Sequence, residues 1–136
     1  MTQQTHRKQG ALEVTGDFQQ LGILFAGATR PNQTQSLHVA LHVRNNSADP
    51  IPFTFNTTQR FEIELADDKG AVVARWSQGK EFGQIVTTEP LPAHSTWTFD
   101  GELLVPRRAG QFTVRMYLIA DKRPGAQSPL HVSDEP

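Results

Sequence analysis

The stretch FEIELADDKGAVVARW, residues 61–76, decides the fold. Apolar and polar residues alternate in both of its arms, which is typical of strands with one buried face. Phe61, Ile63 and Leu65 share one face of the first arm, and Glu62 and Glu64 point the other way. The stretch therefore predicts two antiparallel strands with Phe61, Ile63 and Leu65 turned toward a core.

Residues 67–70 join the two arms and consist of turn formers. Gly70 accepts a positive φ, and the side chains of Asp67 and Asp68 can accept hydrogen bonds from nearby amides. Trp76 ends the second arm on the face of Val72 and Ala74. We therefore expect a β-hairpin in which Trp76 packs in the core and binds nothing.

The composition indicates one soluble domain. The chain has 136 residues, no cysteine and a formal net charge of −1, which suits a single domain with its own core and argues against a nucleic-acid or membrane-surface binder. It has no apolar run of membrane-spanning length. No apolar segment follows the basic residues Arg7 and Lys8, as a secretory signal would require. We expect a cytoplasmic protein.

Further alternating segments flank the hairpin. Segment 37–44 is the clearest, and Pro52 in segment 51–55 lacks an amide hydrogen, which favours an edge strand or a bulge. Gly101 is expected to mark a bulge. About seven to nine short strands at spacings of roughly 8–12 residues, without a helix, predict an all-β protein. We expect an immunoglobulin-like antiparallel β-sandwich without a disulfide. The expected strands are 12–14 with a continuation at 21–25, then 37–44, 51–55, 61–65, 72–77, 84–88, 95–103 and 112–118.

The ends of the chain are polar, so the predicted domain is shorter than the chain. Residues 1–10 are expected to be a disordered tail, residues 11–121 the sandwich, and residues 122–136 a mobile tail. Residues 27–35 are expected to form a loop.

Candidate chemical sites are few. His38 and His42 have the spacing of a zinc pair on a helix, but on a strand they lie about 13 Å apart at ~3.3 Å per residue, too far for one metal. Asp67 and Asp68 lack the further oxygen ligands of a calcium loop. We find no nucleophile motif and no phosphate-binding glycine loop. The sequence predicts no metal, no cofactor and no enzymatic activity.

An aromatic residue followed by an acid is found at Phe61 and Glu62, and a Trp-Ser pair at Trp76 and Ser77. Together with other segments between residues 37 and 118, these motifs resemble the BsuPI family of intracellular proteinase inhibitors, in which the acid is usually Asp. The resemblance implies a sandwich fold and a protein-binding module acting on an intracellular, subtilisin-like serine protease. The alternative is a structural or interaction domain without a protease target. The other matching segments are 41–47, 50–55, 70–75, 82–84 and 91–92.

Leu91 is a candidate contact for a protease. It lies in the stiff segment 89–92, whose two prolines would reduce the ordering cost of docking. An apolar side chain suits a subtilisin-like primary pocket, and the following Pro92 resists cleavage. The alternative is that Leu91 packs in the core and Pro92 shapes a turn.

Basic residues suggest a second candidate surface. If successive loops alternate between the ends of the sandwich, Arg60, Lys80, Arg107 and Arg108 gather at one end. The positive electrostatic field of such a cluster would steer an acidic partner toward that end. The alternative is that these are ordinary solvated charges. The assignment depends on a strand at 84–88, because without it Arg107 and Arg108 move to the other end.

Overall fold

The computed structural model describes residues 2–20 and 35–133, which form ten strands and no helix, so no described helix could span a membrane. All strand pairs are antiparallel. The strands are β1 (Thr2–Gln9), β2 (Leu12–Gln20), β3 (Ser36–Asn45), β4 (Ile51–Phe55), β5 (Phe61–Ala66), β6 (Val72–Arg75), β7 (Thr87–Leu91), β8 (Thr96–Leu104), β9 (Gly110–Leu118) and β10 (Gly125–Val132).

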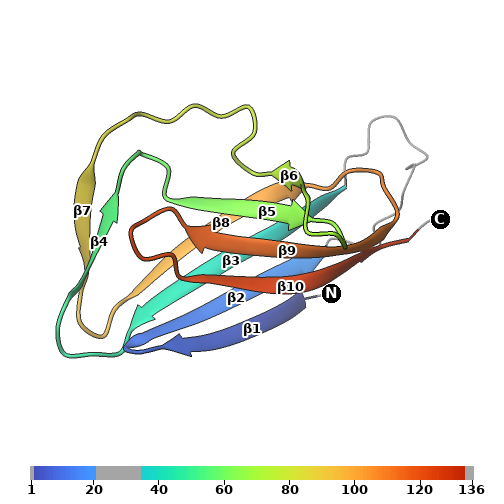
Figure 1. Ribbon diagram of the computed structural model, residues 1–136. Coiled ribbons are helices and arrows are strands. Elements are labelled where there is room, and N and C mark those ends of the chain that lie inside the picture. The colour runs from blue at the N-terminus through green and yellow to red at the C-terminus, as the bar shows by residue number, and fades with distance from the viewer. Residues whose placement is uncertain (1, 21–34, 134–136) are drawn as a thin grey trace.

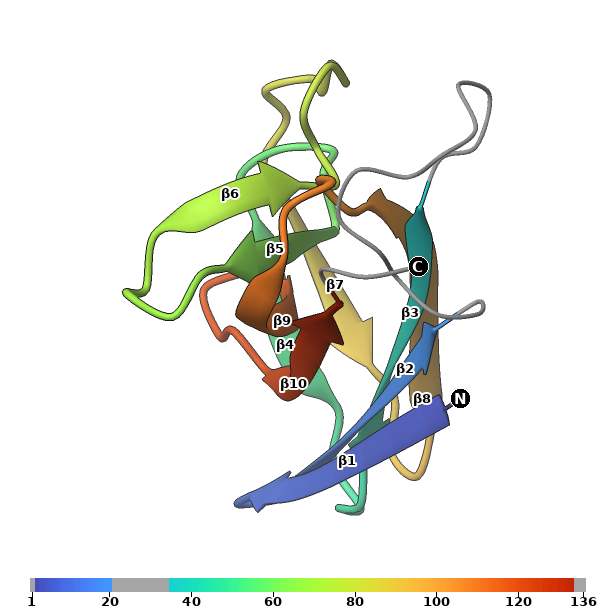
Figure 2. The same cartoon turned by 90° about the vertical axis from the view of Figure 1, so that its right-hand side faces the viewer.

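Two four-stranded sheets form the layers of a sandwich (Figure 1). One has the order β1-β2-β3-β8 and the other β10-β9-β5-β6. The end view in Figure 2 shows the two layers facing each other. The prediction of an all-β antiparallel sandwich is confirmed.

The core is built from alternate residues of the central strands. In β3, Leu37, Val39, Leu41 and Val43 are at most 1% exposed. The inward face predicted for β9 is also buried, and consists of Phe112, Val114, Met116 and Leu118. Burial of these side chains supplies the main favourable term in folding.

Strands β4 and β7 form a separate two-stranded sheet at one end of the sandwich (Figure 1). Phe53 and Phe55 of β4 and Leu91 of β7 have no exposed surface, so this ladder closes the core at that end. Pro52 lies opposite Pro90. Because β4 has only one partner strand, the edge position predicted from Pro52 is confirmed.

The predicted hairpin is formed by β5 and β6. Asp67 Oδ1 accepts hydrogen bonds of 2.9 Å from the amides of both Lys69 and Ala71. Gly70 has a φ of 84°, a value that favours glycine. Asp67 and Gly70, from which the turn was predicted, therefore also hold it in the structure.

Trp76 follows β6 and lies against the opposite sheet. Its side chain is half-buried and packs on the edge of the core. A Cβ atom at Gly101 of β8 would lie only 2.9 Å from Trp76 Nε1. Gly101 pairs regularly with Val39, so the expected bulge is absent; the glycine is needed for the close approach of Trp76.

Both expected tails contain strands, so that prediction is wrong. β1 pairs with β2 after a turn at Gly10, whose φ is 60°. β10 pairs with β9 and buries Leu130 and Val132. Polar composition hid these strands, because nearly all described side chains of β1 and every second side chain in the latter half of β10 face solvent. The continuation expected at 21–25 and nearly all of the loop expected at 27–35 lie outside the described residues.

The strand expected at 84–88 is also misplaced. β7 begins at Thr87 and includes Glu89, Pro90 and Leu91, which had been assigned to a stiff connection. Residues 80–86 form an irregular loop instead. Prolines fit β7 because one of its edges has no partner strand.

We expect Gly101→Val to destabilise the protein by roughly 1–3 kcal/mol, because the new side chain would overlap the Trp76 indole. Urea unfolding measures this change. Glu102→Val is the matched control, since it adds the same side chain at an exposed position of β8. Equal stability of the two variants would contradict the packing described for Trp76.

The turn carboxylate should make stability depend on acid pH. Hydrogen bonds from the Ala71 and Lys69 amides, together with the nearby Arg108, lower the pKa of Asp67 below its ordinary value of 3.8. The ionised form therefore stabilises the fold above that value, and this contribution is lost as pH falls through the lowered pKa. Below about pH 4, wild type should lose stability more steeply than Asp67→Asn in urea unfolding. Identical pH profiles would contradict this role.

Candidate functional site

The most prominent surface feature is the connection between β6 and β7, residues 76–86, which we call the β6–β7 loop. Figure 1 shows it crossing one side of the molecule toward the β4–β7 sheet. Ile85 and Val86 are 57% and 68% exposed. Leu104 is the one other large hydrophobic side chain with such exposure in the described part of the chain. Adjacent exposed apolar residues on one loop mark a candidate contact surface.

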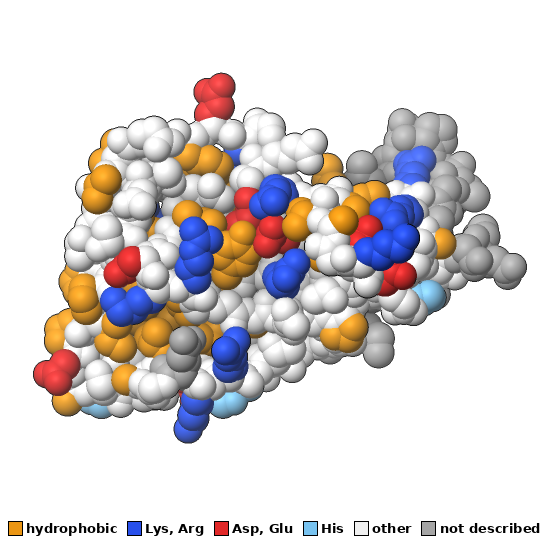
Figure 3. All heavy atoms as spheres, in the orientation of Figure 1, with side chains coloured by type: hydrophobic (Ala, Val, Ile, Leu, Met, Phe, Trp, Pro, Cys, Tyr) orange, Lys and Arg blue, Asp and Glu red, His pale blue; other side chains and the backbone are white. Residues whose placement is uncertain are grey.

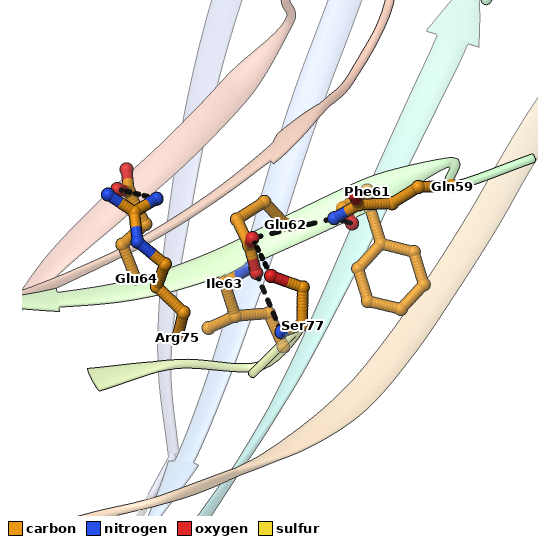
Figure 4. A network of polar contacts seen from close by, with 7 residues as sticks. All are labelled: Gln59, Phe61, Glu62, Ile63, Glu64, Arg75 and Ser77. Carbon is orange, nitrogen blue, oxygen red and sulfur yellow. Dashed lines mark hydrogen bonds and ion pairs between the residues drawn. The ribbon is translucent and has the colours of Figure 1, made fainter. Parts of the chain in front are cut away.

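The start of this loop is tied to β5 by a buried carboxylate (Figure 4). Glu62 is only 4% exposed, although it lies on the outward face of β5. Glu62 Oε1 accepts hydrogen bonds from the amides of Ile63 at 3.0 Å and Ser77 at 3.1 Å. Glu62 Oε2 accepts one from the Ser77 hydroxyl and one from Gln59 Nε2 at 3.4 Å. Both oxygens are thus satisfied, as a buried carboxylate requires.

The neighbouring groups complete a polar layer over β5. Glu64, 9% exposed, pairs with Arg75 Nη1 at 2.9 Å (Figure 4). Tyr117 lies opposite Glu62 in the ladder. Burial raises the pKa of Tyr117, and the charges of Glu64 and Glu62 add to that effect. The layer therefore keeps the Tyr117 hydroxyl protonated beside the carboxylates.

Aromatic rings support the same loop from inside. The Trp76 ring lies 4.3 Å from that of Phe61 and 6.1 Å from that of Phe82, measured between centroids. Lys80 Nζ lies 4.7 Å from the Trp76 ring. These contacts bring the first half of the loop onto the end of the core.

A third anchor fixes the middle of the loop. The Gly83 amide donates to Thr58 Oγ1 at 2.8 Å, and the Thr58 amide donates to the Gly83 carbonyl at 2.9 Å. β7 then begins at Thr87. Ile85 and Val86 therefore lie between two fixed points, the hydrogen-bonded Gly83 and the start of β7. They are exposed apolar residues on a loop that is already ordered.

The two histidines at zinc-pair spacing, His38 and His42, contact different residues. Across the described ranges, no group of three or more His, Cys, Asp or Glu side chains is placed to hold a metal ion. His42 contacts Asp17 at 2.9 Å, and His38 contacts Asp100 at 3.5 Å. The two histidines thus bind different carboxylates.

The predicted contact Leu91 lies in the core. Its side chain has no exposed surface, because β7 turns it into the core at the end of the ladder where it lies opposite Ile51 of β4. The alternative reading, in which Leu91 packs in the core, is the one that the structure shows.

The four predicted basic residues do not share one end of the sandwich. Arg60 precedes β5 at the end where Phe61 pairs with Leu118, whereas Arg107 and Arg108 precede β9 at the other end. The predicted polarity is therefore wrong, because β4 and β7 pair with each other at one end of the sandwich, and neither of them carries the chain from one end to the other (Figure 1).

These basic side chains have local contacts instead. Arg60 pairs with Glu89 at 3.2 Å and lies over the Phe55 ring at 4.4 Å. Arg108 Nη2 lies 3.5 Å from Asp67 Oδ2. Lys80 belongs to the β6–β7 loop, and Arg60 Nη2 donates to Thr87 Oγ1 at 3.5 Å, directly after Val86, so these two lie near the candidate surface. Whether any of them touches a partner stays a prediction.

Sequence reasoning missed Ile85 and Val86 as surface residues, because adjacent apolar residues near a β-branched pair resemble a buried strand. It also missed the burial of Glu62. The available signal was the resemblance itself, which matched the acid at 62 and the Trp-Ser pair at 76 and 77, the partners that the structure joins.

Comparisons with known proteins address both family and fold. A family model described as "BsuPI: Intracellular proteinase inhibitor" matches residues 26–123. None of the curated proteins compared matches the chain.

Solved structures share the sandwich at low sequence identity. The C-terminal domain of wzt is 14% identical with a TM-score of 0.54, over 97% of this chain and 79% of that one. A beta-glucuronidase from glycoside hydrolase family 2 is 13% identical with a TM-score of 0.52, over 86% of this chain but only 11% of the enzyme. The yjhA protein from Bacillus subtilis is 14% identical with a TM-score of 0.45, over 95% and 96%. The first two likenesses support the fold alone.

We expect Glu62→Gln to destabilise the protein by about 1–3 kcal/mol, because a neutral amide has one acceptor oxygen and leaves a buried donor unsatisfied. Urea unfolding measures the change. Glu102→Gln, at an exposed site in β8, is the control and should be neutral. A neutral Glu62→Gln would contradict the structural role of this carboxylate.

Proposed function

Because the chain belongs to the BsuPI family of intracellular proteinase inhibitors, we propose that it binds a subtilisin-like intracellular serine protease through the β6–β7 loop and blocks its active site. The binding is non-enzymatic and needs no cofactor. We choose this loop because it is anchored and because two of its apolar side chains, Ile85 and Val86, are 57% and 68% exposed.

The β6–β7 loop is already ordered in the free protein. A protease binds its substrates as extended segments that add to its own strands. An inhibitor gains affinity when its binding segment is already ordered, because less conformational entropy is lost on docking. Glu62, Trp76 and Thr58 each fix part of the β6–β7 loop.

The chemistry of the two side chains suits this partner. An apolar primary pocket accepts Ile or Val, whose burial contributes about 25 cal/mol per Å² of apolar surface. Lys80, which lies on the same loop over Trp76, adds a cation at the rim. The loop would then dock Ile85 and Val86 first, with basic rim contacts around them.

The alternative is an interaction domain with no protease target. It is favoured by the fold likeness to a domain of wzt and to a small part of a beta-glucuronidase, because a sandwich of this kind is not restricted to inhibitors. In that case the β6–β7 loop would contact a different protein.

Titration of subtilisin activity with the purified protein tests the proposal. We expect near-stoichiometric inhibition by wild type, and a loss of affinity of roughly 100-fold for the double variant Ile85→Asp/Val86→Asp, as for two interface hot spots. Its melting temperature should be unchanged, because both side chains are exposed.

Leu104→Asp is the matched control, since Leu104 is 62% exposed in β8, and it should inhibit like wild type. Inhibition by wild type that survives the double variant would reject the loop but keep the function. Absence of inhibition by wild type of subtilisin and of intracellular serine proteases would reject the function.

A further inference from the structure

A second surface feature is a cavity of about 480 Å³ at the open edge of the sandwich. It lies between β1, β9 and β10, far in sequence from the β6–β7 loop, which contributes none of its lining. The lining residues that matter here are Thr5, Arg7, Arg115, Tyr117, Arg123 and Gln127.

The fold leaves this space open because β1 and β10 are edge strands of different sheets. Ala126 of β10 packs directly on Gly16 of β2, where an added Cβ would lie 2.6 Å from the Ala126 Cβ. β1 continues beneath β10 in Figure 2. Residues of both edge strands line the space between them, together with Arg115, Met116 and Tyr117 of β9.

The cavity is basic. Arg7, Arg115 and Arg123 all line it, and no Asp or Glu of the described residues does. Figure 3 shows Lys and Arg side chains spread over the face that includes β9 and β10. None of the three arginines forms an ion pair with a carboxylate among the residues that the structure describes.

Arg115 carries the strongest sign of a missing partner. Its Nε atom is buried and has no hydrogen-bond acceptor, and Thr5 Oγ1, also at the cavity, is buried without a partner. Glu64 lies opposite Arg115 in the β5–β9 ladder but pairs with Arg75 instead. Buried polar groups are almost always satisfied, so an acceptor from outside the chain is the expected partner.

Two neighbours shape the site around that arginine. Arg123 lies over the Tyr117 ring, with its Cζ 5.8 Å from the centroid. Burial raises the pKa of Tyr117, and the charge of Glu64 and a hydrogen bond to it add to that effect. Guanidinium groups recognise phosphate and carboxylate oxygens with paired donors.

We propose that this cavity binds a small oxyanion, a molecule carrying phosphate or carboxylate groups, with Arg115 as the central contact and Arg7 and Arg123 as its basic walls. A volume of about 480 Å³ lies within the usual range for small-molecule sites. The site is independent of protease binding, because it shares no residue with the β6–β7 loop.

Titration calorimetry of the full chain at constant ionic strength tests this site with two probes, pyrophosphate and citrate, against chloride as reference. We expect saturable binding of at least one probe, weakened about tenfold or more by Arg115→Gln, since a charge-assisted hydrogen bond is lost. Arg108→Gln, which removes an arginine near Asp67 at an unrelated position, should bind like wild type.

The probes separate the two chemistries. If only pyrophosphate binds, the ligand is a phosphate. If only citrate binds, the ligand is a carboxylate. If both bind, the site accepts either group. Unfolding of free Arg115→Gln is measured in parallel, and Arg123→Gln serves as the second variant if the first does not fold. Absence of saturable binding, or equal weakening by Arg115→Gln and Arg108→Gln, would overturn the proposal.

Discussion

The β6–β7 loop depends on the buried carboxylate of Glu62. An ionised group at 4% exposure is costly unless all of its oxygens are bound, and here the donors come from Ser77, Ile63 and Gln59. The same hydrogen bonds have two effects. Ser77 supplies donors to the buried Glu62 carboxylate, and Glu62 fixes the direction in which the chain leaves β6. Trp76, immediately before Ser77, is thereby held against Gly101 of the opposite sheet. One carboxylate thus couples the hairpin, the aromatic contacts and the start of the exposed loop.

Much of the fold could be predicted from the sequence, because burial on one face of a strand leaves a period of two. The β5–β6 hairpin and the inward faces of β3 and β9 followed from that pattern. β1 and β10 did not, since edge strands with polar residues resemble tails. Alternation also placed Glu62 on the outward face correctly, but it gives no sign that another segment covers that face. Burial there depends on where residues 76–77 run, which is a tertiary property.

The candidate site was less accessible to sequence reasoning, for a related reason. Leu91 was suspected as a contact because it lies between prolines, yet prolines are also tolerated in β7, where one edge is unpaired. Assigning residues 84–86 to a strand hides Ile85 and Val86. The end expected for Arg107 and Arg108 is wrong because β4 and β7 pair at one end of the sandwich instead of running its length. The arginines that gather in space, Arg7, Arg115 and Arg123, come from three distant segments. Only the pairing of strands brings them together.

Hydrogen exchange of individual amides, followed by NMR in wild type and in Glu62→Gln, tests the central claim most directly. The account predicts that the amides of Ser77 and Gly83 are protected in wild type, because they donate to Glu62 and Thr58. In Glu62→Gln, protection of Ser77 should fall, whereas amides of the β3–β8 ladder should keep theirs. Exchange of the wild-type Ser77 amide at the rate of an unbonded amide would contradict an ordered β6–β7 loop held by Glu62.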